Sequence, residues 1–254
     1  MDTDKIDYPK LFKTLKKNAP EHSPLSPSSS HRWLVCSDYL SATLNLPSLE
    51  SGKAAKRGTT AHELLEQCLL QEVSPEVLSN DIELGDWVSY ALDFIESYKV
   101  LQPSTQIFPE IFLPWYDVSG GTIDILGISD EEILIADLKT GTWSVEVEDN
   151  TQLLNYAIAA RSALGPRNLY KLVIIQPSGY HKQGPIREWV ITNDRLDIYQ
   201  EIFEEAIQKN MSLEHGRTAG DHCKWCKAEA LCETRANYAL EMIELNLRND
   251  FLEK

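Results

Sequence analysis

The chain has 254 residues and a formal net charge of −15, with 43% hydrophobic and 25% charged residues. This mixture is typical of a globular protein with one large domain or two small ones, and no apolar run approaches the roughly 20 residues of a membrane helix. The charge argues against nonspecific coating of DNA, although an acidic body can still carry a basic groove. Because the N-terminal residues show no signal pattern, we expect a cytoplasmic protein without membrane association.

The expected elements change in character along the chain. A short Lys-rich helix precedes a Pro- and Ser-rich stretch at 19–30, which is typical of a flexible connection. Thr60 and Glu63 form a capping box, which predicts a helix over 59–70. Further helices are expected at 31–46 (short, with a turn), 86–100, 150–163, from Asn193 to about 210 and near the C-terminus, and strands at 106–115, 121–128, 132–139, 169–176 and 186–192. Helices that flank a central mixed sheet predict the α/β class.

A carboxylate and an ammonium group end one of these strands. Asp137 and Lys139 should share a face, with Leu138 turned to the core, and a hairpin turning at 129–132 would bring Asp124 beside Asp137. Two adjacent carboxylates repel each other, and hard oxygen ligands suit Mg²⁺, so the pair predicts a divalent-cation site. Lys139 would orient or deprotonate an attacking water and offset charge on a phosphate. A plain surface ion pair is the alternative.

Three segments, GTIDILGI, ILIADLKTG and QLLNYA, together resemble the PD-(D/E)xK nuclease superfamily in its RecB-like branch. The resemblance implies a restriction-endonuclease-like fold and metal-dependent hydrolysis of DNA. It assigns catalytic roles to Asp124, Asp137, Lys139, Gln152 and Tyr156. Gln152 and Tyr156 are four residues apart and so share one helix face. Taken singly, they would be an exposed polar residue and a core aromatic.

Metal ligation is implied by the same resemblance. The expected ligands are His62 in the upstream helix, Asp124, Asp137 and the backbone carbonyl of Leu138. The ion would be Mg²⁺ or Mn²⁺, and an imidazole ligand shifts the preference somewhat toward Mn²⁺. Glu110 is a weaker candidate, because an edge-strand surface Glu explains it equally well.

The cysteines have a distinctive spacing. Cys223, Cys226 and Cys232 form Cys-x2-Cys-x5-Cys, and Cys36 lies far upstream. In a cytosolic chain such a group indicates metal before disulfides. Zinc, held by four cysteines or by three with His222, is one interpretation. The layout is also similar to that of RecB-like nucleases such as AddB and the CRISPR-adaptation nucleases, which implies a 4Fe–4S cluster that joins the N- and C-terminal segments.

The resemblance also predicts how the chain is divided. We expect a nuclease domain over 31–235, with the iron–sulfur segment at 223–232. A helix and linker over 1–30 would precede this domain, and a helix over 236–254 would follow it.

A DNA exonuclease is the function that follows. Its substrate would be linear DNA, single- or double-stranded, contacted by Lys53, Lys56 and Arg57. The segments SSSHRWLVCSDYL and KRGTTAHELLEQ look like phage and prophage proteins, which implies a role and a partner in phage-type replication or recombination within a bacterial host. Two alternatives stay open: a noncatalytic DNA- or partner-binding module that keeps the fold, and a redox sensor whose cluster is the working part.

Overall fold

The chain forms two compact units, each built from separate stretches of sequence. The computed structural model describes residues 6–20, 23–47, 52–212 and 216–252. The first unit, here called the sheet unit, comprises residues 1–27 and 51–199, and the second, the cysteine unit, comprises residues 28–50 and 200–254. Nothing in the described part of the chain is a helix long and apolar enough to cross a membrane.

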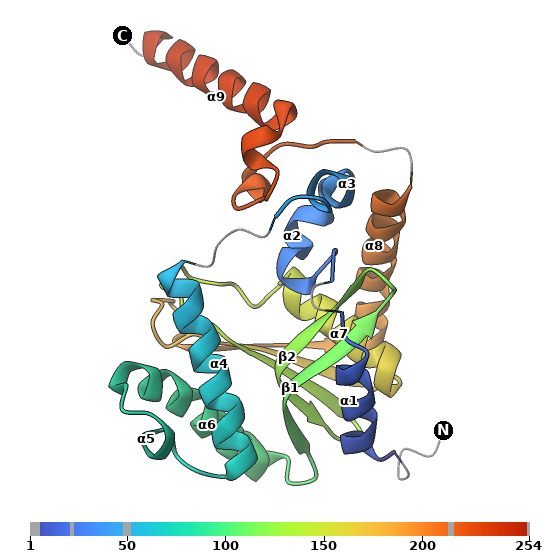
Figure 1. Cartoon of the computed structure of the whole chain (residues 1–254), viewed down its shortest axis with the longest axis vertical. Helices are drawn as coiled ribbons and strands as arrows, with labels where there is room; N and C mark the ends of the chain where they lie inside the picture. The colour runs from blue at the N-terminus through green and yellow to red at the C-terminus, as the bar shows by residue number, and fades with distance from the viewer. Residues whose placement is uncertain (1–5, 21–22, 48–51, 213–215, 253–254) are drawn as a thin grey trace. The chain divides into compact units, whose positions relative to one another are not determined.

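A five-stranded mixed sheet, ordered β1-β2-β3-β4-β5, is the centre of the sheet unit (Figure 1). The strands are β1 (Gln106–Trp115), β2 (Ser119–Ile128), β3 (Glu132–Leu138), β4 (Leu169–Ile175) and β5 (Ile186–Thr192). Only the β3–β4 pair is parallel, and α7 (Thr151–Leu164) connects its two strands. The predicted antiparallel hairpin of β2 and β3 is confirmed. The sheet has helices on both faces, consistent with the predicted restriction-endonuclease-like α/β fold.

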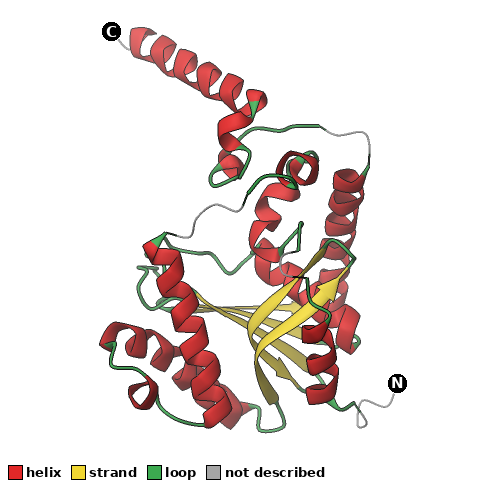
Figure 2. Ribbon diagram, viewed as in Figure 1, coloured by secondary structure: helices red, strands yellow, loops and turns green. Residues whose placement is uncertain are grey.

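Helices cover the two faces of the sheet (Figures 1 and 2). Helices α4 (Lys53–Gln71) and α6 (Ile82–Leu101), with the short α5 (Pro75–Leu78) beside them, bury one face of the sheet. Ala136 and Leu138 point into this core, as the alternation along β3 predicts. Helix α7 packs against the opposite face, and α1 (Tyr8–Lys17) packs on β1. The neighbouring residues of β3 therefore face α7.

Helix α4 begins earlier than the capping box predicts. Its first residue is Lys53, and the Thr60 hydroxyl donates to the Lys56 carbonyl oxygen within the helix at 3.2 Å. The predicted start near residue 59 is therefore wrong. Two alanines and two lysines, all good helix formers, extend the helix toward its N-terminus through Gly58. This places His62 well inside a long helix rather than in its first turn.

The Pro- and Ser-rich stretch at 19–30 is anchored where the structure describes it. Leu25 is completely buried, and its N–H donates to the Val118 carbonyl oxygen at 2.9 Å. Its own carbonyl oxygen accepts from the Ser119 hydroxyl at 2.9 Å. Residues 21–22 of the stretch lie outside the described residues. Leu25 thereby fixes this part of the chain against the start of β2.

The cysteine unit combines the segment before α4 with the segment that follows β5. It contains α2 (Ser30–Trp33), α3 (Tyr39–Thr43), the later part of α8 (Asn193–Met211), 3-10 turns at Asp221–Cys223 and Glu229–Leu231, and α9 (Glu233–Leu252). Trp33 is completely buried and packs edge-on against Phe203. The side-chain amide of Asn210 donates to the Trp33 carbonyl oxygen at 2.9 Å and accepts from the Leu40 N–H at 3.1 Å.

Candidate active site

An imidazole and two carboxylates meet where α4 crosses the β1–β2 pair. Nδ1 of His62 lies 3.1 Å from Oδ1 of Asp124 and 3.7 Å from Oε1 of Glu110. Within the described ranges, this trio is the one group of three or more His, Cys, Asp or Glu residues whose ligand atoms all lie within 4.8 Å of one another. Such a set of two oxygen donors and one nitrogen donor suits Mg²⁺ or Mn²⁺.

Glu110 has a backbone conformation that is unusual for a strand. Its φ is 49°, in the left-handed region, and its side chain points toward His62 rather than along the open edge. Strain of this kind costs about 1–3 kcal/mol and persists where the surroundings enforce it. Oε1 of Glu110 is buried and has no hydrogen-bond partner. A buried carboxylate oxygen without a hydrogen-bond partner is costly, and a bound cation would compensate for that cost.

A second group of side chains lies between β3 and α7. Nζ of Lys139 lies 2.7 Å from Oδ2 of Asp137 and donates to Oε1 of Gln152 at 2.9 Å. Nε2 of Gln152 donates to Oδ1 of Asp137 at 2.9 Å and contacts the Tyr156 hydroxyl at 3.2 Å. The structure therefore brings together the Asp-x-Lys and Gln-x-x-x-Tyr residues of the sequence pattern, and Gln152 holds both charged groups of the strand.

The hairpin register connects these two groups. Ile125 pairs with Ala136, which places Asp124 and Asp137 at the next position of the two strands. Oδ2 of Asp124 accepts the Leu138 N–H at 2.7 Å, so the backbone of β3 fixes one carboxylate oxygen while the other faces His62. Both carboxylates are almost completely buried. Burial and fixed orientation suit a metal ligand better than a surface ion pair.

The charges at the site are strongly perturbed. Burial opposes protonation of His62, but the neighbouring carboxylates of Asp124 and Glu110 raise its pKa to about 10. Burial raises the pKa of Asp137, although the adjacent Lys139 ammonium opposes this shift. Burial would lower the pKa of Lys139, but the Asp137 carboxylate reverses the effect and raises it. The buried carboxylates therefore favour a positive charge at the site. A divalent cation would supply this charge in place of the His62 proton.

The predicted DNA contacts at the start of α4 differ in their surroundings. Lys53 and Lys56 are exposed. Arg57 forms ion pairs with Asp81 at 2.9 Å and with Glu83 at 2.6 Å. Its guanidinium group also lies 5.2 Å from the centre of the Trp87 ring. Arg57 therefore joins α4 to α6, whereas the two lysines are accessible to a ligand.

Sequence reasoning missed Gln176, which follows the last residue of β4 and is 1% exposed. Its Nε2 donates to the carbonyl oxygens of Gly141 at 2.6 Å and Trp143 at 2.8 Å. Its Oε1 accepts from the Val145 N–H at 3.1 Å and from Arg187 at 2.7 Å. Gln176 thus fixes the loop that follows Lys139. The only signal in the sequence is a polar residue at the end of an apolar run, VIIQ.

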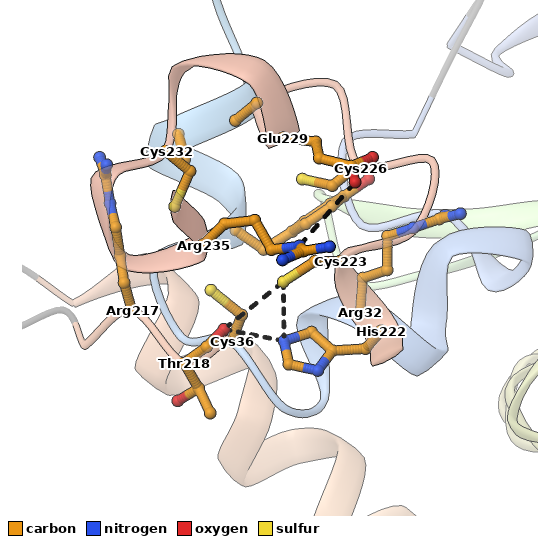
Figure 3. A pocket seen from close by; sticks show the side chains of 13 residues that line it. Arg32, Cys36, Arg217, Thr218, His222, Cys223, Cys226, Glu229, Cys232 and Arg235 are labelled. Atoms are coloured by element: carbon orange, nitrogen blue, oxygen red, sulfur yellow. Dashed lines mark hydrogen bonds and ion pairs between the residues drawn. The ribbon is translucent and has the colours of Figure 1, made fainter. Parts of the chain in front are cut away.

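Four cysteines of the cysteine unit line one pocket (Figure 3). They are Cys36, Cys223, Cys226 and Cys232, and all are free thiols. The segments that carry them are connected by hydrogen bonds from Arg32 to the Lys224 carbonyl oxygen at 3.1 and 3.2 Å. The fold therefore brings to one pocket the residues that the sequence pattern groups together.

The spacing of the thiols is wider than that of a closed zinc site. In the described structure, no three of their sulfur atoms lie within 4.8 Å of one another. The same holds for any set of three ligand atoms that includes a nitrogen of His222. Tetrahedral zinc with Zn–S bonds of about 2.3 Å places its sulfurs roughly 3.8 Å apart. In the same pocket, Sγ of Cys223 lies 3.7 Å from Nε2 of His222. The remaining cysteine, Cys68, lies elsewhere, buried in the α4–α6 core of the sheet unit.

The fold and the site define a restriction-endonuclease-like α/β protein with a candidate divalent-metal centre. The chain belongs to the family described as "Protein of unknown function (DUF2800)", whose profile matches residues 22–252. It is similar to the solved structure described as "Crystal structure of SSO0001", with 14% identity and a TM-score of 0.37 over 91% of this chain and 98% of that one. It is also similar to a "Putative exonuclease" from Eubacterium rectale, with 15% identity and a TM-score of 0.48 over 89% of this chain and 91% of that one.

Proposed function

We propose that this protein is a metal-dependent deoxyribonuclease that acts as an exonuclease on linear DNA. The observation that carries the proposal is the buried Asp137–Lys139 pair beside the trio of His62, Glu110 and Asp124. Phosphodiester hydrolysis needs an activated water, a positive group near the phosphate and fixed positions for both. The two groups of side chains supply these requirements at one end of the hairpin.

The metal would be held by His62, Asp124, Asp137 and the Leu138 carbonyl, and Glu110 adds a further oxygen donor. When bound, Mg²⁺ or Mn²⁺ supplies a Lewis acid for the phosphate and lowers the pKa of water. The chain's own residues prepare the site before the ion arrives. The Leu138 N–H orients Asp124, and the α4 backbone places the imidazole between the two acids.

Lys139 acts on the water and the phosphate in this proposal. Its ammonium group is held between Asp137 and Gln152, so it orients the attacking water and offsets charge that grows on the phosphate oxygens. Gln152 is a positioning residue, because it contacts Asp137 and Lys139 at once. Tyr156 limits the rotation of the Gln152 amide through its hydroxyl group.

The substrate and the setting are part of the same proposal. Lys53 and Lys56 are exposed at the start of the helix that carries His62, where they would contact the DNA backbone. A cytoplasmic role in phage-type replication or recombination rests on the resemblance of the two flanking sequence segments to phage and prophage proteins.

A timed digestion of end-labelled linear DNA beside a covalently closed circle tests the activity. With Mn²⁺ or Mg²⁺ we expect the linear DNA to shorten and the circle to stay intact, and we expect no cleavage with EDTA. Nicking of the circle would show an endonuclease instead. Binding of DNA without cleavage in either metal would support the noncatalytic module.

Metal binding is a separate prediction with its own measurement. We expect Glu110→Gln to weaken Mn²⁺ binding about 10- to 100-fold, by analogy with the loss of other groups that support a metal site. The amide keeps the shape of the side chain but removes its charge. Titration calorimetry measures the affinity, and Glu188→Gln on β5 is the matched control. An unchanged affinity would show that Glu110 is not a ligand.

We also propose a 4Fe–4S cluster in the cysteine pocket, held by Cys36, Cys223, Cys226 and Cys232. Two features support this choice over zinc. The sulfurs line one pocket but are too far apart for a closed tetrahedral site, whereas a multi-iron cluster separates its thiolates more widely. Arg32, Arg217 and Arg235 also line the pocket, where they would offset the negative charge of thiolates and cluster.

A further inference from the structure

Two loops lie side by side at the end of the sheet that carries Lys139. One loop follows β3 and the other follows β4. The Ser178 hydroxyl donates to the Thr140 carbonyl oxygen at 2.7 Å, and Nε2 of His181 lies 3.2 Å from Oε1 of Glu146. The Lys139 N–H itself donates to the Ile175 carbonyl oxygen at 2.8 Å, just before the second loop. These contacts place both loops next to the proposed catalytic residues.

The first loop is held in place by a buried support rather than by its own packing. Gln176 contacts three of its backbone groups, at Gly141, Trp143 and Val145. Arg187 is 2% exposed and donates to the same Gln176 oxygen at 2.7 Å. Because Gln176 is buried, binds the loop backbone and is itself held by Arg187, the backbone around Trp143 is a fixed platform.

Each loop presents a large aromatic side chain to solvent. Trp143 is 83% exposed and Tyr180 is 90% exposed. These are the two highest values among the aromatic residues that the structure describes. Exposing an indole forfeits the burial energy that normally places Trp inside a protein. Here that exposure is combined with a fixed backbone, only four residues beyond Lys139.

We propose that Trp143, together with Tyr180 on the neighbouring loop, stacks on unpaired bases and makes single-stranded DNA the preferred substrate of the site. This inference rests on the proposed function, because it names the form of DNA that the same site takes. A paired base inside a duplex presents only its edges, whereas an unpaired base offers a ring face. Stacking needs an exposed, well-positioned aromatic surface, which these loops supply.

The charges of the first loop favour stacking over phosphate contact. Glu146, Glu148 and Asp149 are exposed on the first loop, and they would repel a DNA backbone. His181 lies against Glu146, and the Tyr199 hydroxyl donates to Asp149, so two of these acids have partners within the protein. These acids offer no phosphate contact, so at the first loop we expect the attraction to come from the ring face of Trp143 and to depend little on salt.

Binding measured in EDTA tests the inference without requiring cleavage. We expect an oligothymidylate to quench the tryptophan fluorescence of the full chain, and Trp143→Leu to remove most of that quenching. We expect the same substitution to weaken single-strand binding about tenfold, the scale of one stacked base, without changing the salt dependence. Trp143→Phe should restore most of the affinity. Tyr90→Leu, which removes an exposed ring from α6, should leave binding unchanged.

Three results would overturn the inference. The first is a Trp143→Leu protein that binds oligothymidylate as tightly as the parent chain does. The second is an equal loss of affinity for single strands and for a blunt duplex of the same length. The third is a salt dependence of single-strand binding that is smaller in Trp143→Leu than in the parent chain, because this would assign Trp143 to phosphate binding. The proposed function fails separately, through an absence of metal-dependent cleavage, because the binding assay needs neither metal nor catalysis.

Discussion

Replacing Lys139 with Ala is expected to lower the rate of metal-dependent DNA cleavage about 100- to 1,000-fold. Loss of one fixed group that stabilises transition-state charge has effects of this size. The Lys139 ammonium lies 2.7 Å from Asp137 and 2.9 Å from Gln152, and these two contacts fix it at the end of β3. End-labelled linear DNA with saturating Mn²⁺ provides the rate.

The control separates this effect from general damage to the sheet. Lys171 on β4 is partly buried and forms an ion pair with Glu188 at 2.7 Å, so Lys171→Ala removes a comparable group. We expect that variant to cleave DNA at close to the original rate. Lys139→Arg keeps the charge but changes its geometry, and it should recover little activity. If Lys139→Ala cleaved DNA normally while folded, as judged by thermal melting, the proposed role of Lys139 would be wrong.

The hairpin shows why part of the site could be predicted from sequence. The alternation along β3 places Asp137 and Lys139 on one face, and a tight turn aligns Asp124 with Asp137. These are local rules, and they hold in the structure. The approach of His62 to Asp124 comes from a helix distant in sequence, so only the resemblance to a known pattern suggested it.

Other features depend on contacts that no local pattern encodes. The basic stretch predicts a DNA contact at Arg57, and the structure adds ion pairs with Asp81 and Glu83 at the start of α6. The sequence alone leaves Glu110 as either a site acid or an edge-strand acid, and a left-handed backbone at that residue turns its carboxylate to His62. The capping box at Thr60 was a plausible signal, and favourable residues before it outweighed it.

Removing one thiol of the cysteine pocket is expected to change both metal content and stability. We expect Cys223→Ala to lose the iron, the sulfide and the visible absorbance of anaerobically purified protein. The same change should lower the melting temperature by about 5–10 °C, because roughly 2–3 kcal/mol of metal-linked stability would be lost. Cys68→Ala is the matched control, since that thiol is buried in the sheet unit and should leave the iron content unchanged.

Hydrogen exchange would locate this loss of stability. Residues 28–47 contact the Cys-rich stretch 216–232 through exposed hydrogen bonds, including Arg32 with the Lys224 carbonyl oxygen and Ser37 with Gly216. Exposed contacts of this kind are weak, so a cluster that closes the long loop between Cys36 and Cys223 would supply much of the cohesion between these two stretches. In Cys223→Ala we therefore expect faster exchange at 28–47 and 216–232 and little change in β3. Colourless protein with stoichiometric zinc would contradict the cluster, and cleavage that follows the oxidation state of the iron would favour the redox sensor over a structural role.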